Sequence, residues 1–267
     1  MMYWIYDYPS YVVGALFGGV FVAAALFGIF VLRPFIRGWI HTERRANDMF
    51  GMTLSSFSVL YAFLLGLLAL AAFQNYTVVG DLVTKEASSM AALYRDFGGY
   101  PEPVRGQLRE NLKSYTRDVI QDSWPQQQRG VAPTLGSEFI ATLVDHMIAF
   151  EPEKKSQEII HAEALRQLDN LIELRRARLS NVASGIPTVF WWVVAIGALI
   201  NILLIWMLDM EVHVHALLGG ALALFLGIVI FMIAALDHPF RGGVSIGPDA
   251  IQQVYDSLMN TPPAASR

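Results

Sequence analysis

Metal-ligand residue types alternate in the short segment that joins the last two apolar stretches of this sequence. Glu211, His213 and His215 occupy every second position there, and an extended chain would point all three side chains to one side. A structural metal site needs four ligands, and no second pair is evident. His146 and His161 stand singly on amphipathic segments and are expected at the surface. We therefore expect no metal centre and no cofactor.

Catalytic residue patterns are equally scarce. The sequence holds no P-loop, H-E-x-x-H or dinucleotide-binding motif, and it has no cysteine for a thiolate nucleophile or a disulfide. A catalytic pocket would have to use Asp237 and His238 beside Asn47 and Asp48, but the topology derived below puts these two pairs on opposite sides of a membrane. We therefore expect no catalytic site.

Small side chains recur along the second apolar stretch in a pattern that suits ion passage. They follow one another at steps of three and four, which places them on one face of a helix: Gly51, Ser55, Ser58, Ala62, Gly66 and Ala69. One interpretation is close helix packing within a single chain, which small residues permit in lipid. The other is a pore lining, in which serine hydroxyls replace part of an ion's hydration shell. The pore-lining candidates are Ser55, Ser58, Ala62, Gly66 and Ala69.

Four long uncharged stretches must position this face. The chain of 267 residues is 54% hydrophobic and only 16% charged, and its charged residues avoid four ranges entirely: 11–32, 49–73, 186–208 and 216–236. Each range reaches the roughly 20 apolar residues that cross a ~30 Å hydrocarbon core, where the backbone must satisfy its own hydrogen bonds as a helix. We predict an all-α integral membrane protein with four transmembrane helices, arranged two plus two around a helical soluble insert.

The same stretches favour passive over active transport. None contains Asp, Glu, Lys, Arg or His, whereas pumps and proton relays place ionisable residues at membrane depth. Asn201 is the deepest strongly polar side chain, and we expect it to form a hydrogen bond between helices. Gly14 and Gly18 on the first span, and Gly219 and Gly227 on the last, predict close helix packing within the chain and between chains.

The insert between the second and third spans is predicted to be helical throughout. Apolar residues recur at three and four from Val104 to Val119, which is the pattern of one buried helix face. Pro125 and the polar residues after it are expected to end this helix. A short helix follows up to Phe150, and a long amphipathic helix then occupies residues 153–184.

One charge in the insert stands at an apolar position. Arg175 lies on the apolar stripe of the long helix, where a buried charge needs a partner. The candidate partners are Glu86 and Asp96, both on the extension of the second span into the insert.

A basic linker separates the first two spans. It holds Arg33, Arg37, Arg44 and Arg45, whereas residues 1–10 contain no Lys or Arg. Because short cytoplasmic loops are enriched in basic residues, this asymmetry favours a cytoplasmic linker and an extracytoplasmic insert, although the arginines at 175, 176 and 178 favour the opposite orientation. At the mouth of a pore, the linker arginines would concentrate small anions. A net charge of −4 without a larger basic cluster argues against a nucleic-acid partner.

Several motifs resemble a known family. Arg45–Gly51, leading to Val59–Leu65, is similar to the entry of the second helix in bestrophin-like membrane proteins, a bacterial family of unknown function. Leu236–Gly242 and Ile246–Ala250 resemble the closing signature of that family. The positions that carry the likeness are Asn47, Asp48, Tyr61, Pro187, Asp237, Pro239, Phe240, Gly242 and Pro248. The resemblance implies the two-plus-two topology and, by analogy with bestrophins, an oligomeric anion channel lined by the second helix.

These features lead to one favoured hypothesis and one alternative. We expect a transmembrane pair in residues 1–80, the insert in 81–185, a second pair in 186–236 and a tail in 237–267. The favoured hypothesis is a homo-oligomer in the bacterial inner membrane that conducts small ions passively, with anions preferred. The alternative is a non-conducting membrane scaffold or sensor whose insert binds a partner.

Overall fold

The computed structural model describes residues 3–32, 35, 46–133 and 136–260, and helices are the only regular elements in this part of the chain. The described residues form two compact units. The first draws on residues 1–75, 185–237 and 242–244, and the second on 76–184, 238–241 and 245–267. The helix α3 (Ala46–Asp96) contributes to both units. The predicted all-α membrane fold with a helical insert is confirmed.

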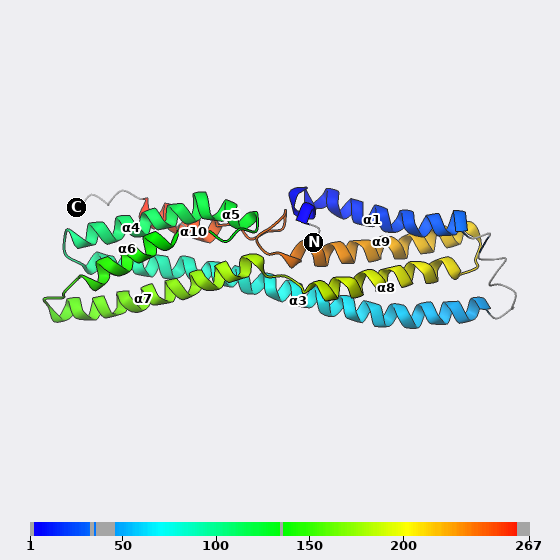
Figure 1. The fold of residues 1–267 in the computed structure, drawn as a ribbon, viewed down its shortest axis with the longest axis horizontal. Coiled ribbons are helices and arrows are strands. Elements are labelled where there is room, and N and C mark those ends of the chain that lie inside the picture. Colours follow the sequence, from blue (N-terminus) through cyan, green and yellow to red (C-terminus); the bar gives the residue numbers. More distant parts are fainter. Residues whose placement is uncertain (1–2, 33–34, 36–45, 134–135, 261–267) are drawn as a thin grey trace. The chain divides into compact units, whose positions relative to one another are not determined.

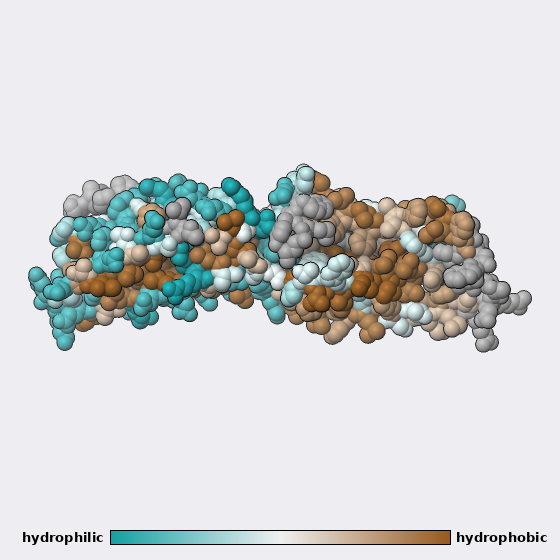
Figure 2. Space-filling view, in the orientation of Figure 1, coloured by the Kyte–Doolittle hydropathy of each residue, from teal (hydrophilic) through white to brown (hydrophobic). Residues whose placement is uncertain are grey.

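The first unit holds the four stretches that are long and apolar enough to cross a membrane. They are α1 (Ser10–Phe27) with its π-helical continuation η2 (Gly28–Leu32), the first half of α3, α8 (Thr188–Met207) and α9 (Val212–Asp237). A short 3-10 helix, η1 (Tyr3–Asp7), precedes them. Figure 1 shows α1 beside α9, and Figure 2 shows the brown, hydrophobic surface over this unit. An apolar outer surface is what lipid contact requires.

Close packing of glycines joins α1 to α9, the most extensive helix pair among the described residues. A Cβ on Gly227 would lie 2.9 Å from the Phe17 carbonyl oxygen, and one on Gly18 would lie 2.8 Å from the Leu224 side chain. The atoms beside Gly227 belong to the backbone and leave no room for a methyl group, so the two helices approach closely there. The packing predicted within the chain for these glycines is confirmed.

Two hydrogen bonds join α3 to α8 within the first unit. The Tyr61 hydroxyl donates to the Val194 carbonyl at 2.7 Å, and the Tyr61 ring lies directly over Gly197. The Ser58 hydroxyl donates to Oδ1 of Asn201 at 2.9 Å. The hydrogen bond between helices predicted for Asn201 is therefore confirmed.

The second unit is a bundle around an apolar core. Its helices are the second half of α3, the 3-10 helix η3 (Phe97–Gly99), α4 (Val104–Asp118), the π-helix η4 (Val119–Ser123), α5 (Trp124–Gln128), α6 (Gly136–Ile148), α7 (Lys155–Ser180), the 3-10 helix η5 (Asn181–Ala183), α10 (Asp249–Val254) and the π-helix η6 (Tyr255–Met259). The predicted α4 face is buried, with Leu108, Leu112 and Tyr115 inaccessible to solvent.

The helix ends within the polar residues that follow Pro125, as predicted, although Pro125 itself does not interrupt it. The chain passes from α4 through the π turn η4 into α5, and Pro125 stands in the first turn of α5. The helix ends only at Gln128.

Two glycines of α9 allow a matched test of the α1–α9 contact. Gly227→Ala should destabilise the protein by about 1–3 kcal/mol, because the methyl group overpacks the contact with the Phe17 backbone. Gly220, on the same helix, has no neighbouring atom within 4 Å of a Cβ, so Gly220→Ala should leave stability unchanged or raise it. Thermal unfolding of both variants in detergent measures the difference, and equal melting temperatures would contradict the proposed contact.

Candidate functional site

The small-residue face of α3 is left largely uncovered by its own chain. Ser55, Ala62 and Gly66 are exposed, and Ala69 is half-buried. A Cβ built on Gly66 would meet no atom within 4 Å. This differs from Gly18 and Gly227, whose small size is used in contacts inside the chain.

The position of this face around α3 follows from about 100° of rotation per residue. Leu54, Tyr61 and Leu65 form the buried side of the helix, and the small residues lie next to that side. Large apolar side chains such as Phe63 and Leu67 are exposed on the side of α3 that lies away from the buried residues, beyond the small-residue face. The small-residue face is thus a narrow flank between a packed side and a bulky apolar side.

Ser58 is the member of this flank that its own chain engages most. Its side chain is half-buried, and its hydroxyl proton is directed to Asn201 on α8. The Ser58 oxygen retains lone pairs but has no free proton to offer an ion. The pore-lining role of Ser55, Ser58, Ala62, Gly66 and Ala69 stays a prediction.

Phe73 is a residue on this flank that the sequence reasoning missed. It follows Ala69 by four positions and Gly66 by seven, so it continues the same face of α3. Its side chain is 56% exposed. The helical spacing was available in the sequence, but a search for small residues passes over a bulky one.

The structure describes the first residues of α3 but not the arginines predicted at the pore mouth. Arg33, Arg37, Arg44 and Arg45 lie outside the described residues. Asn47 accepts a hydrogen bond from the Asp209 backbone N–H at 2.8 Å through its side-chain oxygen.

Asp48 is exposed in the first turn of α3, where a carboxylate interacts favourably with the helix dipole.

The family-signature residues near the ends of α8 and α9 make main-chain contacts. Pro187 precedes the first residue of α8. The Asp237 carboxylate accepts the Ile186 backbone N–H, which fixes the last residue of α9 to the entry of α8 within the first unit. His238 places Nδ1 3.0 Å from the Ser184 carbonyl oxygen. These contacts give the signature a structural explanation.

The rest of the tail signature shapes turns and core contacts. Phe240 is buried and packs edge-on against Trp124 with ring centroids 5.7 Å apart. The Pro239 carbonyl accepts the Ile246 N–H at 2.8 Å. Gly242 has φ +82°, a conformation that side chains disfavour.

Pro248 caps the start of α10, where its carbonyl oxygen accepts the Gln252 N–H at 2.8 Å.

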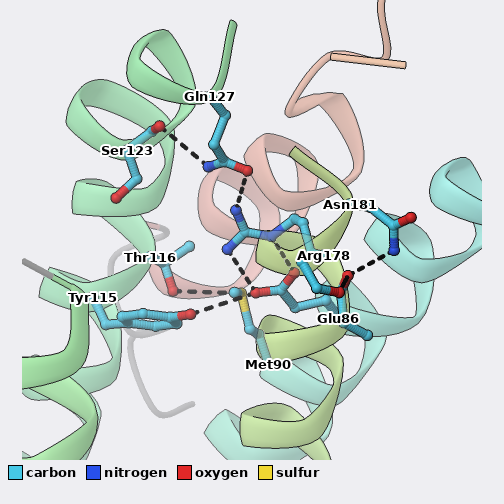
Figure 3. Close-up of polar contacts among 10 residues, drawn as sticks. Glu86, Met90, Tyr115, Thr116, Ser123, Gln127, Arg178 and Asn181 are labelled. Atoms are coloured by element: carbon cyan, nitrogen blue, oxygen red, sulfur yellow. Dashed lines mark hydrogen bonds and ion pairs between the residues drawn. The ribbon is translucent and has the colours of Figure 1, made fainter. Parts of the chain in front are cut away.

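A buried ion pair lies inside the second unit (Figure 3). Arg178 of α7 donates from Nε to Glu86 Oε2 at 2.6 Å and from Nη2 to Oε1 at 3.0 Å. The two residues are 1% and 0% exposed. The Nη1 group donates to Gln127 Oε1 at 2.6 Å, and the Trp124 ring lies 5.4 Å from the guanidinium carbon. These additional partners offset part of the cost of removing two charges from water.

The protonation of this network follows from its burial. Burial raises the pKa of the Tyr115 hydroxyl, and the Glu86 carboxylate raises it further; this hydroxyl donates to Glu86 Oε1 at 3.4 Å. Burial acts to lower the pKa of Arg178, but the Glu86 carboxylate and its hydrogen bonds outweigh burial and raise that pKa. The guanidinium therefore stays charged and the phenol stays neutral.

The prediction that Arg175 carries the buried charge was wrong. Arg175 is only half-buried, and Arg178, three positions further along α7, pairs with Glu86. Of the two candidate acids, Glu86 is the partner and Asp96 is not, and the predicted helix is correct. The helix is rotated so that Leu168 and Leu171 are its most buried leucines, which turns position 178 inward.

A second polar cluster joins η3 to α7. The Tyr100 hydroxyl lies 2.8 Å from Nδ1 of His161, and the Phe150 ring packs on both residues. Burial lowers the pKa of His161, so the neutral imidazole is favoured and can accept the Tyr100 proton. Burial also raises the pKa of Tyr100 to about 12, with a further contribution from the Asp96 charge. His161 is thus part of a packed cluster rather than a free surface residue.

Comparisons with known proteins place this architecture. A family model described as the Bestrophin-like domain matches residues 19–251. A crystal structure of a variant of a bacterial bestrophin homologue from Klebsiella pneumoniae matches with a TM-score of 0.70 at 12% identity, over 91% of this chain and 98% of that chain. Another structure of a bestrophin homologue from that organism gives 0.66 at 11% identity, over 90% and 95% of the two chains. No curated protein matches the sequence. At these identities the structural likeness shows a shared fold.

The buried ion pair predicts a characteristic mutational pattern. Glu86→Gln and Arg178→Met should each destabilise the protein by about 3–5 kcal/mol, because each leaves one buried charge without its partner. The double variant Glu86→Gln with Arg178→Met should lose less than the sum of the single losses, since no unpaired charge remains. Thermal and denaturant unfolding of the three proteins measures this coupling. Strict additivity would show that the pair contributes nothing as a pair.

The Tyr100–His161 contact predicts a dependence of stability on pH. Folding lowers the pKa of His161. The stability that His161 contributes is therefore complete above its ordinary pKa of about 6.5, and it is lost as the pH falls through the pKa of the folded state. The melting temperature should therefore fall as the pH drops below about 6.5, and His161→Gln should flatten this slope.

Asp96 provides the control for this dependence. Burial and the nearby Glu163 charge raise the pKa of Asp96, so its contribution has the opposite sign and is lost as pH rises. Asp96→Asn should leave the histidine-dependent slope in place. If the melting temperature of His161→Gln depends on pH as steeply as that of the wild type, His161 is not the cause of the dependence.

Proposed function

Because this chain belongs to the bestrophin-like family, we propose that several copies assemble in the membrane and form a passive ion-conducting pore lined by α3. The protein is an integral membrane protein of all-helical fold. The observation that carries the proposal is the small-residue flank of α3, which the chain's own helices leave exposed.

The contrast between the spans supports this assignment. Gly18 and Gly227 pack in the α1–α9 contact, and Gly197 packs against the Tyr61 ring. Gly66 of α3 meets no neighbour, although small residues in lipid-embedded helices are favoured where something approaches closely. A second copy of the chain or a water-filled lumen would account for such a flank.

Side chains along this flank would form a pore of mostly apolar character. Ser55 supplies one hydroxyl near the end where α3 begins, and Ala62 and Gly66 leave the middle wide. Phe73 would narrow the pathway at the other end of the span, and apolar constrictions of this kind control passage by dewetting. Such a pore needs no ionisable residue at membrane depth.

Charge and orientation complete the proposal. The linker residues Arg33, Arg37, Arg44 and Arg45 would raise the concentration of small anions at one mouth, so we propose a modest preference for anions. We place the linker in the cytoplasm and the insert outside, in the inner membrane of a bacterium, on the basis of the charge asymmetry across the first span.

Conductance of the purified protein in planar bilayers tests the pore. Ala62→Trp should reduce the single-channel conductance by about ten-fold or more, because an indole would fill the lumen. Phe73→Ala should raise the conductance, because it removes the constriction. Leu60→Trp is the matched control, since Leu60 is exposed on the opposite side of α3, and its conductance should stay near the wild-type value.

Three outcomes would overturn the proposal. A protein that is monomeric in mild detergent has no central pore. A wild-type oligomer without conductance supports the non-conducting scaffold or sensor instead. Equal conductance of wild type and Ala62→Trp would show that the α3 flank does not line the ion pathway.

A further inference from the structure

A polar amide is packed deep in the first unit, between two membrane-spanning helices. Asn201 of α8 is 7% exposed, and its Oδ1 accepts the hydroxyl proton of Ser58 on α3 at 2.9 Å. This hydrogen bond uses only the oxygen of the amide. The nitrogen Nδ2 carries two further N–H donors, and neither donates to another group in the part of the chain that the structure describes.

The Asn201 nitrogen is not sealed inside the helix packing. In the same unit, Nδ1 of His215 is buried without a hydrogen-bond partner. The Asn201 nitrogen also has no partner, but it is not among the enclosed atoms of this kind in the described residues. Water-sized molecules therefore reach the Asn201 nitrogen, although nine-tenths of the residue is buried.

The position of Ser58 shows which side of α3 the amide adjoins. Tyr61 faces α8 directly, with its ring over Gly197. At about 100° per residue, Ser58 lies about 60° round α3 from Tyr61, in the same direction as Ala62 at about 100°. Because Nδ2 and Oδ1 belong to one amide, the nitrogen of Asn201 lies at this edge of the α3–α8 contact, beside the small-residue flank.

Membrane depth limits what can satisfy these N–H groups. Hydrocarbon offers no acceptor, and a polar group left without a partner there costs free energy. Water or a permeating ion beside the flank would supply the acceptor. Since Ser58 directs its own proton to Oδ1, the N–H groups of Asn201 are the hydrogen-bond donors that this pair presents, and such donors favour anions over cations.

We propose that Asn201 contacts permeating anions through its N–H groups and contributes to the anion preference of the pore. Ser58 is then a positioning residue, because its hydroxyl holds Oδ1 and so orients the nitrogen. This inference rests on the proposed function, and it assigns a selectivity-determining residue to α8 rather than to α3. The linker arginines would act on anions at a distance, which salt screens, whereas a direct contact persists at high salt.

Reversal potentials in planar bilayers test the contact. With KCl at about 1 M on one side and about 0.3 M on the other, the Debye length is roughly 3–6 Å, so the linker arginines contribute little. Asn201→Leu, which is similar in size but has no donor, should lower the permeability ratio of chloride to potassium by about two- to ten-fold, as expected when a hydrogen bond is lost. Ser58→Ala should lower the same ratio, because the amide is no longer held.

Tyr61→Phe is the matched control. It removes the other hydrogen bond between α3 and α8 and changes no donor beside the flank. Tyr61→Phe and Asn201→Leu should both lower the melting temperature in detergent, but only Asn201→Leu should change the permeability ratio. If Asn201 only joined the two helices, the two variants would behave alike.

The outcomes separate this contact from the pore itself. A wild-type protein that does not conduct overturns the pore and the anion contact together. If the wild type conducts, Ala62→Trp blocks it and Asn201→Leu keeps the wild-type permeability ratio, the pore stands and the anion contact is overturned. Should Asn201→Leu fail to fold, Ser58→Ala decides, because Ser58 is only half-buried and alanine fits in its place.

Discussion

Lipid offers apolar helices no reason to associate, and this constraint governs how the membrane part of the chain is built. In water, burial of Leu and Phe would hold four such helices together, but in hydrocarbon those side chains are as well solvated outside the bundle as inside it. What remains is the closeness of backbone contact and a few hydrogen bonds. Gly18 and Gly227 supply the first for α1 and α9. Tyr61 and Ser58 supply the second for α3 and α8.

The insert solves the opposite problem, because its helices are amphipathic and its core is driven by the hydrophobic effect. Burial of apolar side chains from α4, α6 and α7 specifies that helices pack, but many rotations of a helix bury similar area. The Glu86–Arg178 pair favours the one rotation that brings the two side chains together, since either charge buried alone would be strongly unfavourable. Gln127 and Tyr115 extend that requirement to α5 and α4. We infer that this network selects one register among several apolar packings.

Much of the fold could be predicted from the sequence, and the successes and failures have physical causes. The four spans were predictable because a ~30 Å apolar layer demands long uncharged stretches, and few other structures require them. Asn201 was predictable because a polar amide in that setting needs a partner. Arg178 was missed because α7 has two adjacent apolar rows, and a charged residue on the second row is naturally assigned to solvent. The main-chain role of Asp237 was also missed, since nothing in a carboxylate's neighbours along the chain indicates which backbone N–H it will accept.

The candidate site illustrates a more general limit of periodicity. A row of small residues at spacings of three and four shows that something approaches one face of a helix, but it does not show what approaches. On α1 and α9, Gly18 and Gly227 are explained by contacts within the chain. On α3, Ser58 is hydrogen-bonded and Ala69 is half-buried, whereas Ser55, Ala62 and Gly66 are exposed. The structure of one chain therefore removes the internal explanation for most of the α3 flank. An approach from outside the chain, as in the proposed assembly around α3, would account for the exposed residues of this flank.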